Sequence, residues 1–184
     1  MASPVLILPG IGNSGPAHWQ SLWEAADPAF VRVQQKDWDN PTCADWVANL
    51  EQAVRAAGPD VVLVAHSLAC LAVAHWAARP HSPIKGALLV AVPDPQGPEF
   101  PVQASGFAQT PTAPFDFPST LVASSDDPYG SLEHTRRLAE NWGSEVVEIG
   151  ARGHINANSG LGNWPAGLDL LAQLQETAEV AAAQ

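Results

Sequence analysis

The fold of this chain is decided by the stretch DVVLVAHSLACL, from Asp60 to Leu71. Its first half, Val61–Ala65, is apolar at every position, which is typical of a strand buried on both faces of a parallel sheet. Its second half begins a run rich in alanine and leucine, which predicts a helix over Leu68–Ala78. A single hydroxyl, that of Ser67, lies at the abrupt junction. The stretch therefore indicates an α/β protein in which Ser67 has a special position.

Two roles for Ser67 are open on this stretch alone. Serine is a favoured N-cap residue, because its hydroxyl can accept a hydrogen bond from the free N–H groups of a helix's first turn. The same strand–turn–helix pattern occurs in α/β-hydrolases as the nucleophile elbow, written Gly-x-Ser-x-Gly. Here Ala65 and Ala69 stand in place of both glycines, so the motif is degenerate. An acid and a histidine at other strand ends would favour the catalytic role.

Length and composition limit the classes of protein. A chain of 184 residues is long enough for a single core, so we predict one domain over residues 1–184. The formal net charge of −11 argues against nucleic acid or an anionic membrane as a partner. No apolar run approaches the roughly 20 residues that span a bilayer, and the N-terminus lacks the pattern of a signal peptide. We therefore expect a cytoplasmic location.

The cysteines and histidines do not suggest a disulfide framework or a metal site. Cys43 and Cys70 are the only cysteines, which is too few for a disulfide-stabilised fold. No cluster of histidines, cysteines and acids has the spacing of metal ligands. We therefore expect no metal and no cofactor.

Strand-like and helix-like runs alternate along the chain. Apolar runs predict strands over Val5–Leu8, Phe30–Gln34, Val61–Ala65, Gly86–Val92, Thr120–Ser124 and Val146–Ile149. Helices are predicted over Trp19–Ala26, Ala44–Ala57, Leu68–Ala78, Ser131–Trp142 and Ala166–Val180. Such alternation forms βαβ units, and it predicts one doubly wound, mostly parallel sheet of about six strands with helices on both faces.

One long connection, from Pro93 to Pro118, interrupts this alternation. It is rich in proline, glycine and small polar residues, with phenylalanines spread along it. A loop of this length in a compact domain usually has a function or packs locally. Because it follows the fourth predicted strand, we expect it near Ser67, as a partial cover over a cleft rather than a full lid. Packing of its aromatic residues on the surface is the alternative.

A glycine-rich turn, PGIGNSG at residues 9–15, follows the first predicted strand. It lacks the Gly-Lys-Ser/Thr ending of a P-loop. Its glycines have the spacing of a dinucleotide-binding turn, but the next predicted strand, Phe30–Gln34, does not end in the acidic residue that such a turn requires. Its main-chain N–H groups suit an oxyanion hole instead, and we assign this role to Ile11 and Gly12 together with Leu68. A flexible turn without function is the alternative. The side chains predicted to line the site near this turn are those of Asn13, His18, Trp19 and His66.

The acid and the histidine follow the last two predicted strands. Asp126 and Asp127 are adjacent, and we favour Asp127 because Pro128 restricts its backbone to an extended direction. His154 follows the sixth strand, after a glycine turn. The order Ser67, Asp127, His154 is that of α/β-hydrolases. His66 is adjacent to the serine, and its side chain is predicted to leave the elbow in another direction.

These residues resemble the small serine hydrolases related to retinoblastoma-binding protein 9. The resemblance rests on Leu8-Pro9-Gly10 with His18-Trp19, on His66-Ser67-Leu68-Ala69, on Asp127-Pro128-Tyr129, and on a block from Gly153 to Gly167. It implies a compact α/β-hydrolase fold without a full lid, and a catalytic triad of Ser67, Asp127 and His154. It implies no particular protein partner, because no binding motif for a retinoblastoma-type protein is present.

The sequence therefore predicts a serine hydrolase that cleaves small carboxylic esters or related acyl substrates through an acyl-enzyme. Thioesters and amides would use the same residues, so these substrates stay open. A function of another class also stays open, in which the fold is a binding module with an inactive site. The degenerate elbow favours this alternative, whereas the presence of all three triad residues argues against it.

Overall fold

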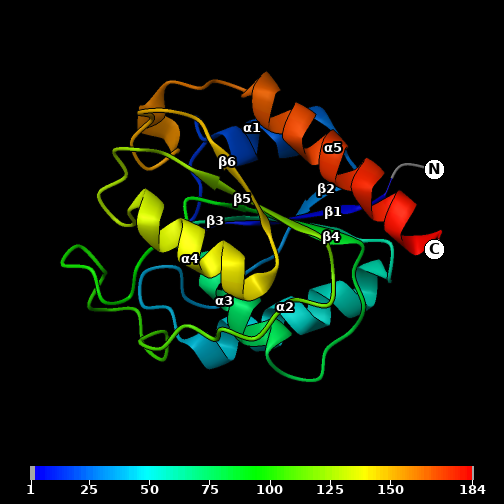
Figure 1. Cartoon of the computed structure of the whole chain (residues 1–184), viewed down its shortest axis with the longest axis horizontal. Helices are drawn as coiled ribbons and strands as arrows, with labels where there is room; N and C mark the ends of the chain where they lie inside the picture. The colour runs from blue at the N-terminus through cyan, green and yellow to red at the C-terminus, as the bar shows by residue number, and fades with distance from the viewer. Residues whose placement is uncertain (1–2, 184) are drawn as a thin grey trace.

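Six strands form one sheet in the computed structural model, which describes residues 3–183 (Figure 1). They are β1 (Val5–Leu8), β2 (Phe30–Arg32), β3 (Val62–His66), β4 (Gly86–Val90), β5 (Ser119–Ala123) and β6 (Glu145–Glu148). The order is β2-β1-β3-β4-β5-β6, and every neighbouring pair is parallel. The central strands β3 and β4 are buried at every position, as their continuous apolar sequence requires.

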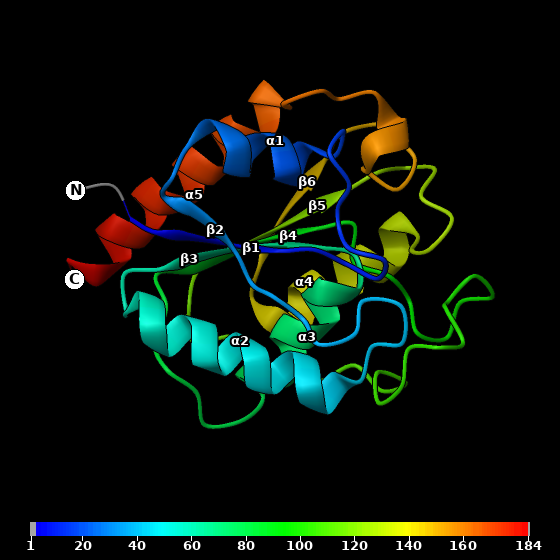
Figure 2. The same ribbon diagram turned by 180° about the vertical axis from the view of Figure 1, so that it is seen from behind.

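Helices cover both faces of the sheet. They are α1 (Trp19–Ala26), α2 (Cys43–Ala57), α3 (Leu68–Ala77), α4 (Leu132–Trp142) and α5 (Pro165–Ala182). Figure 2 shows α1 and α5 on one face and α2, α3 and α4 on the other. Each layer encloses its own apolar core against the sheet. The predicted doubly wound α/β fold is thus confirmed. None of the described helices is long and apolar enough to cross a membrane.

The direction of the chain across the sheet reverses between β1 and β3. From β1 the chain passes through α1 to the edge strand β2, whereas from β3 it passes through α3 to β4 on the other side. In open α/β sheets, ligands bind at such a switch point, outside the carboxyl ends of the strands. The loops that leave β1 and β3 are the glycine-rich turn and the turn at Ser67. The fold therefore brings two parts of the predicted site together.

The element bounds differ from the sequence prediction in small ways. β2 ends at Arg32 rather than Gln34, because this edge strand pairs with β1 alone and only as far as Ile7. A short 3-10 helix, η1 (Ala157–Ser159), was not predicted. It is closed by reciprocal hydrogen bonds between Asn156 and Ser159, a local arrangement that apolar periodicity does not reveal.

The connection between β4 and β5 contains neither an α-helix nor a strand in this described part of the chain. It is tied to the start of α2 by a single bridge between Thr42 and Ser105. Phe107 and Phe117 are buried in the core, whereas Phe100 lines a pocket beside Ser67. The loop therefore borders the pocket near Ser67, as predicted, whereas two of its aromatic residues pack in the core rather than on the surface.

Candidate active site

Ser67 lies in the sharp turn between β3 and α3. Its backbone has φ 56° and ψ −126°, a conformation that residues other than glycine rarely adopt. Ser67 occupies the N-cap position of α3, but its side chain makes no capping hydrogen bond. Its Oγ lies 2.7 Å from Nε2 of His154 instead. The hydroxyl is therefore directed to the histidine and is not used to cap the helix.

The elbow closes although alanines stand on both sides of the serine. Ala65 and Ala69 are buried and fit within the turn. The close approach is made by Gly10, in the loop after β1. A Cβ on Gly10 would lie 3.1 Å from the Cβ of Ser67 and 3.1 Å from the carbonyl oxygen of His66. Glycine is therefore needed in the neighbouring loop rather than beside the serine.

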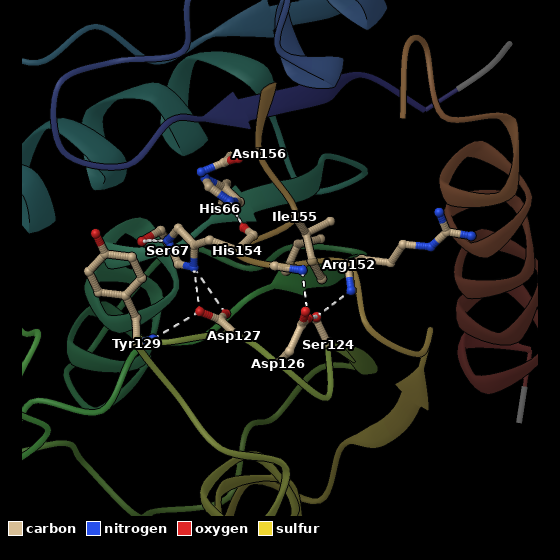
Figure 3. A network of polar contacts seen from close by, with 12 residues as sticks. His66, Ser67, Ser124, Asp126, Asp127, Tyr129, Arg152, His154, Ile155 and Asn156 are labelled. Atoms are coloured by element: carbon tan, nitrogen blue, oxygen red, sulfur yellow. Dashed lines mark hydrogen bonds and ion pairs between the residues drawn. The ribbon is translucent and has the colours of Figure 1, made fainter. Parts of the chain in front are cut away.

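His154 connects Ser67 to Asp127 (Figure 3). Its Nδ1 lies 2.9 Å from both carboxylate oxygens of Asp127. The side chains of His154 and Asp127 are only 11% and 3% exposed. The main-chain N–H of Tyr129 donates to the same carboxylate at 3.0 Å, and the Tyr129 ring packs on the imidazole. Side chains from three strand ends thus form one continuous hydrogen-bonded chain.

Asp126 has a different set of partners. Its Oδ1 accepts hydrogen bonds from the Ser124 hydroxyl at 2.8 Å and from the main-chain N–H of Gly153 at 2.7 Å. The Gly153 N–H, as the strongest influence, lowers the pKa of the Asp126 carboxyl below its usual value. Asp126 therefore fixes the loop that carries His154, and Asp127 is the carboxylate that meets the imidazole.

The predicted oxyanion hole needs one correction. The main-chain N–H of Gly12 donates to the carbonyl oxygen of Trp38 at 2.8 Å, so it is not available to a substrate. Gly12 has φ +76°, in the left-handed region that favours glycine. Ile11 and Leu68 both line the pocket. Within residues 3–183 no acceptor takes the main-chain N–H of Ile11 or of Leu68.

His66 lines the pocket, as predicted, although its side chain leaves the elbow in another direction than that of Ser67. Its Nε2 lies 2.9 Å from the main-chain carbonyl oxygen of His154, and the two rings are 5.0 Å apart. Burial holds the pKa of His66 well below its ordinary value. Because β3 extends to His66, the strand and not the turn sets where this side chain points.

His18 and Asn13 line the pocket as predicted, whereas Trp19 does not. His18 caps α1, since its Nδ1 accepts from the N–H of Gln20 at 3.1 Å. Burial, with smaller contributions from nearby Arg32 and His154, lowers the pKa of His18 to about 4. Trp19 is buried behind the site, where its indole N–H donates to the carbonyl oxygen of Ile155 at 2.8 Å.

The pocket beside Ser67 has a volume of about 340 Å³. The sequence predicts that the loop of residues 93–118 partly covers the cleft, but it does not indicate which residues of the loop line the pocket. The lining residues that were not predicted are Gly10, Pro93, Glu99, Phe100, Pro101, Gln103, Tyr129 and Asn156. Among the described residues that line the pocket, Glu99 alone is acidic and none is lysine or arginine. Within residues 3–183 no group of three or more His, Cys, Asp or Glu side chains is placed to hold a metal ion.

Both cysteines are buried outside the pocket. Cys70 lies one helical turn beyond Ser67, and its Sγ contacts the carbonyl oxygen of Val90 at 3.4 Å. Burial raises the pKa of the Cys70 thiol far above its usual value. Burial also raises the pKa of the Cys43 thiol, at the start of α2.

Comparisons with known proteins agree with this arrangement. A family model described as "Serine hydrolase" matches residues 5–173. A comparison with curated proteins gives no match. A solved structure described as a YdeN-like hydrolase, from Pectobacterium atrosepticum, is 32% identical, with a TM-score of 0.83 over 95% of this chain and 91% of its own.

Two further solved structures share the fold at lower identity. The ydeN gene product of B. subtilis is 20% identical, with a TM-score of 0.76 over 94% of this chain and 98% of its own. The RedJ thioesterase of the prodiginine pathway in Streptomyces coelicolor is 15% identical, with a TM-score of 0.65 over 95% of this chain and 91% of its own.

Proposed function

The chain belongs to the serine hydrolase family, and from this premise we propose that it hydrolyses small carboxylic esters with Ser67 as nucleophile. Family membership agrees with the resemblance that the sequence motifs indicate. The observation that supports the proposed role most directly is the hydrogen-bonded chain from the Ser67 Oγ through His154 to Asp127. A nucleophile within hydrogen-bond reach of a base that a third group orients is the arrangement that acyl transfer requires.

In the proposed mechanism, Nε2 of His154 takes the Ser67 proton as the Oγ attacks the ester carbonyl carbon. The tetrahedral oxyanion accepts hydrogen bonds from the main-chain N–H groups of Leu68 and Ile11. His154 then donates the proton to the departing alcohol, which leaves an ester on Ser67. The same imidazole then activates a water molecule, which attacks the carbonyl carbon of this ester. The bond to the Ser67 Oγ breaks, the carboxylic acid leaves, and the imidazole returns the proton to Ser67. Asp127 holds the proton on Nδ1 of His154 and stabilises the charged ring.

The pocket supports a small substrate without negative charge. A volume of about 340 Å³ lies at the lower end of the range for ligand pockets and suits a short acyl chain with a modest leaving group. Glu99 would repel a carboxylate or phosphate, and none of the described lining residues is a lysine or arginine that would attract one. We therefore place neutral esters with short acyl chains first among the candidates.

The test is hydrolysis of p-nitrophenyl acetate and butyrate, with labelling by a fluorophosphonate probe. Ser67→Ala should abolish labelling, and His154→Ala should abolish both labelling and turnover above background. Asp127→Asn should lower kcat by roughly 10⁴-fold, as loss of the orienting carboxylate does in a comparable triad. Asp126→Asn is the matched control. It removes the charge of the neighbouring carboxylate but keeps an oxygen that can accept from Ser124 and Gly153, so the loop stays in place and kcat should stay within about tenfold of wild type.

The alternative of a non-catalytic binding module gives a different result in the same experiment. Folded wild-type protein would then neither react with the probe nor hydrolyse either ester. Labelling that persists in Ser67→Ala would mean that another residue is the nucleophile. Parallel assays with an acetyl thioester and an acetyl anilide, compared by kcat/KM, would identify the preferred leaving group.

A further inference from the structure

The loop that carries His154 has little regular structure of its own, since it lies between the end of β6 and η1. Its main chain is held at three successive residues. The N–H of Gly153 donates to Asp126, and the carbonyl oxygen of Ile155 accepts from the Trp19 indole. Between them, the carbonyl oxygen of His154 itself lies 2.9 Å from Nε2 of His66. Figure 3 shows the His66 ring above the His154 main chain.

The direction of this last hydrogen bond follows from its chemistry. A carbonyl oxygen only accepts, so Nε2 of His66 must carry the proton and donate. His66 is 5% exposed, and its ring packs against the rings of His18 and His154 at 4.8 and 5.0 Å. Burial, with His154 and His18 nearby, holds the pKa of His66 well below its ordinary value. The ring therefore remains a neutral donor in one fixed orientation.

We propose that His66 is a positioning residue, whose Nε2–H holds the main chain of His154 so that the catalytic imidazole stays in reach of Ser67. This inference rests on the proposed function. His66 ends the buried central strand β3 and is directly followed by Ser67, so nucleophile and anchor share one rigid segment. Its hydrogen bond goes to the main-chain carbonyl oxygen of His154 and not to a ring nitrogen, so His66 acts through geometry rather than by moving a proton.

Two substitutions distinguish the effect of the Nε2–H donor from the effect of the ring itself. His66→Gln places an amide N–H at a similar reach, whereas His66→Phe keeps a planar ring and removes the donor. Kinetics with p-nitrophenyl butyrate should be expressed per active site, titrated with the fluorophosphonate probe. We expect His66→Phe to lower kcat by roughly 10- to 100-fold with a smaller effect on KM, because a displacement of about 1 Å at the reacting groups has such a cost. His66→Gln should recover most of this loss.

The control is His75→Phe, which makes the same change in a histidine of α3 that does not line the pocket. It should leave kcat per titrated site unchanged. A purely structural role for His66 would reduce the number of titratable sites and the thermal stability but not kcat per site. If His66→Phe keeps wild-type kcat per site, or if His66→Gln is as slow as His66→Phe, the positioning role is overturned.

A second readout does not depend on activity. Imidazole ¹⁵N spectra of the wild type should show the Nε2–H tautomer of His66, and the His154 ring resonances should shift in His66→Phe but not in His66→Gln. An Nδ1–H tautomer would overturn the proposal even in an active enzyme. If the wild type fails to hydrolyse esters or to label, the proposed function fails, and these spectra still decide whether His66 holds His154.

Discussion

Ser67 holds a backbone conformation that costs on the order of 1–3 kcal/mol for a residue with a side chain, so its surroundings must enforce it. Its N–H donates to the carbonyl oxygen of Val90 on β4, and its carbonyl oxygen accepts from the N–H of Cys70 in α3. The serine is thus fixed from the sheet and from the helix at once. A strained, over-determined turn of this kind is typical of a preorganised nucleophile.

Gly10 and Gly12 test this geometry because they differ in what a side chain would meet. Gly10→Ala would press a methyl group against Ser67 and the His66 carbonyl oxygen. We expect the loop to shift in response and to carry the Ile11 N–H away from the elbow. We expect kcat to fall by roughly 10- to 100-fold. Gly12→Ala meets nothing within 4 Å but has φ +76°, so it should cost about 1 kcal/mol of stability and leave kcat nearly unchanged. Ester kinetics measure kcat and urea unfolding measures the stability of each variant. Equal kcat values for the two variants would contradict this account.

Side-chain chemistry at single residues was predictable from sequence only where a local rule applied. The preference for Asp127 over Asp126 followed from Pro128, and the structure places Asp127 against the imidazole. The direction of the Gly12 N–H depends on Trp38, far along the chain, and no local pattern reveals it. The contact between His66 and the His154 carbonyl oxygen was also not predicted, because it depends on where β3 ends.

At the scale of elements, three tryptophans join α1 to the loop that follows His154. Trp19, Trp23 and Trp164 pack together with ring centroids 4.7–6.0 Å apart. The indole N–H of Trp19 donates to Ile155, and that of Trp23 donates to the carbonyl oxygen of Asn163. The loop that carries His154 is therefore supported by α1, which lies more than a hundred residues earlier in the sequence.

Gly167, in the first turn of α5, permits this packing. A Cβ at Gly167 would lie 2.3 Å from Cε3 of Trp164. Gly167→Ala should lower the free energy of unfolding by about 1–3 kcal/mol, because the indole must shift in a filled core. Gly15→Ala is the control, since its Cβ would meet nothing within 4 Å and its φ is not left-handed. Equal unfolding midpoints in urea for the two variants would show that Trp164 can move freely.

The elements themselves were largely predictable. β1 and α1 have the predicted bounds, because apolar periodicity and clear end signals define both. The end of β2 depended on how far its neighbour β1 reaches, and η1 depended on a hydrogen bond between Asn156 and Ser159. Pairing between strands and local side-chain bonding are not contained in a hydrophobic pattern. For the same reason β4 ends at Val90 rather than Val92, and most other bounds shift by a residue or two.

For the whole molecule, buried neutral histidines link stability to pH. His18 has a pKa lowered to about 4 by burial, with Arg32 and His154 as smaller causes, and the pKa of His66 is also lowered well below normal. Unfolded histidine binds a proton below about pH 6.5, whereas these folded side chains do not. The contribution of these histidines to the free energy of unfolding should therefore be fully present above pH 6.5. As the pH drops toward 4, the free energy of unfolding should fall by about 1.4 kcal/mol per pH unit for each such histidine.

Urea unfolding at pH 7, 6 and 5 measures this dependence, and His18→Asn isolates one contribution. Asparagine can still cap α1 by accepting the Gln20 N–H, but it does not titrate. Between pH 6 and pH 5 the variant should lose about 1 kcal/mol less stability than the wild type. Parallel pH dependences for the two proteins would mean that His18 is protonated in the folded state.

The burial of both thiols affects how this protein should respond to oxidants and alkylating agents. Cys70 lies one helical turn from Ser67, yet its burial raises the pKa of its thiol and so disfavours the thiolate. Oxidants and alkylating agents act on thiolates, and the Cys43 thiol is likewise buried with a raised pKa. In the proposed hydrolase the nucleophile is a hydroxyl, so treatment with peroxide or iodoacetamide should leave ester hydrolysis largely unchanged, whereas an enzyme with a cysteine nucleophile would lose its activity.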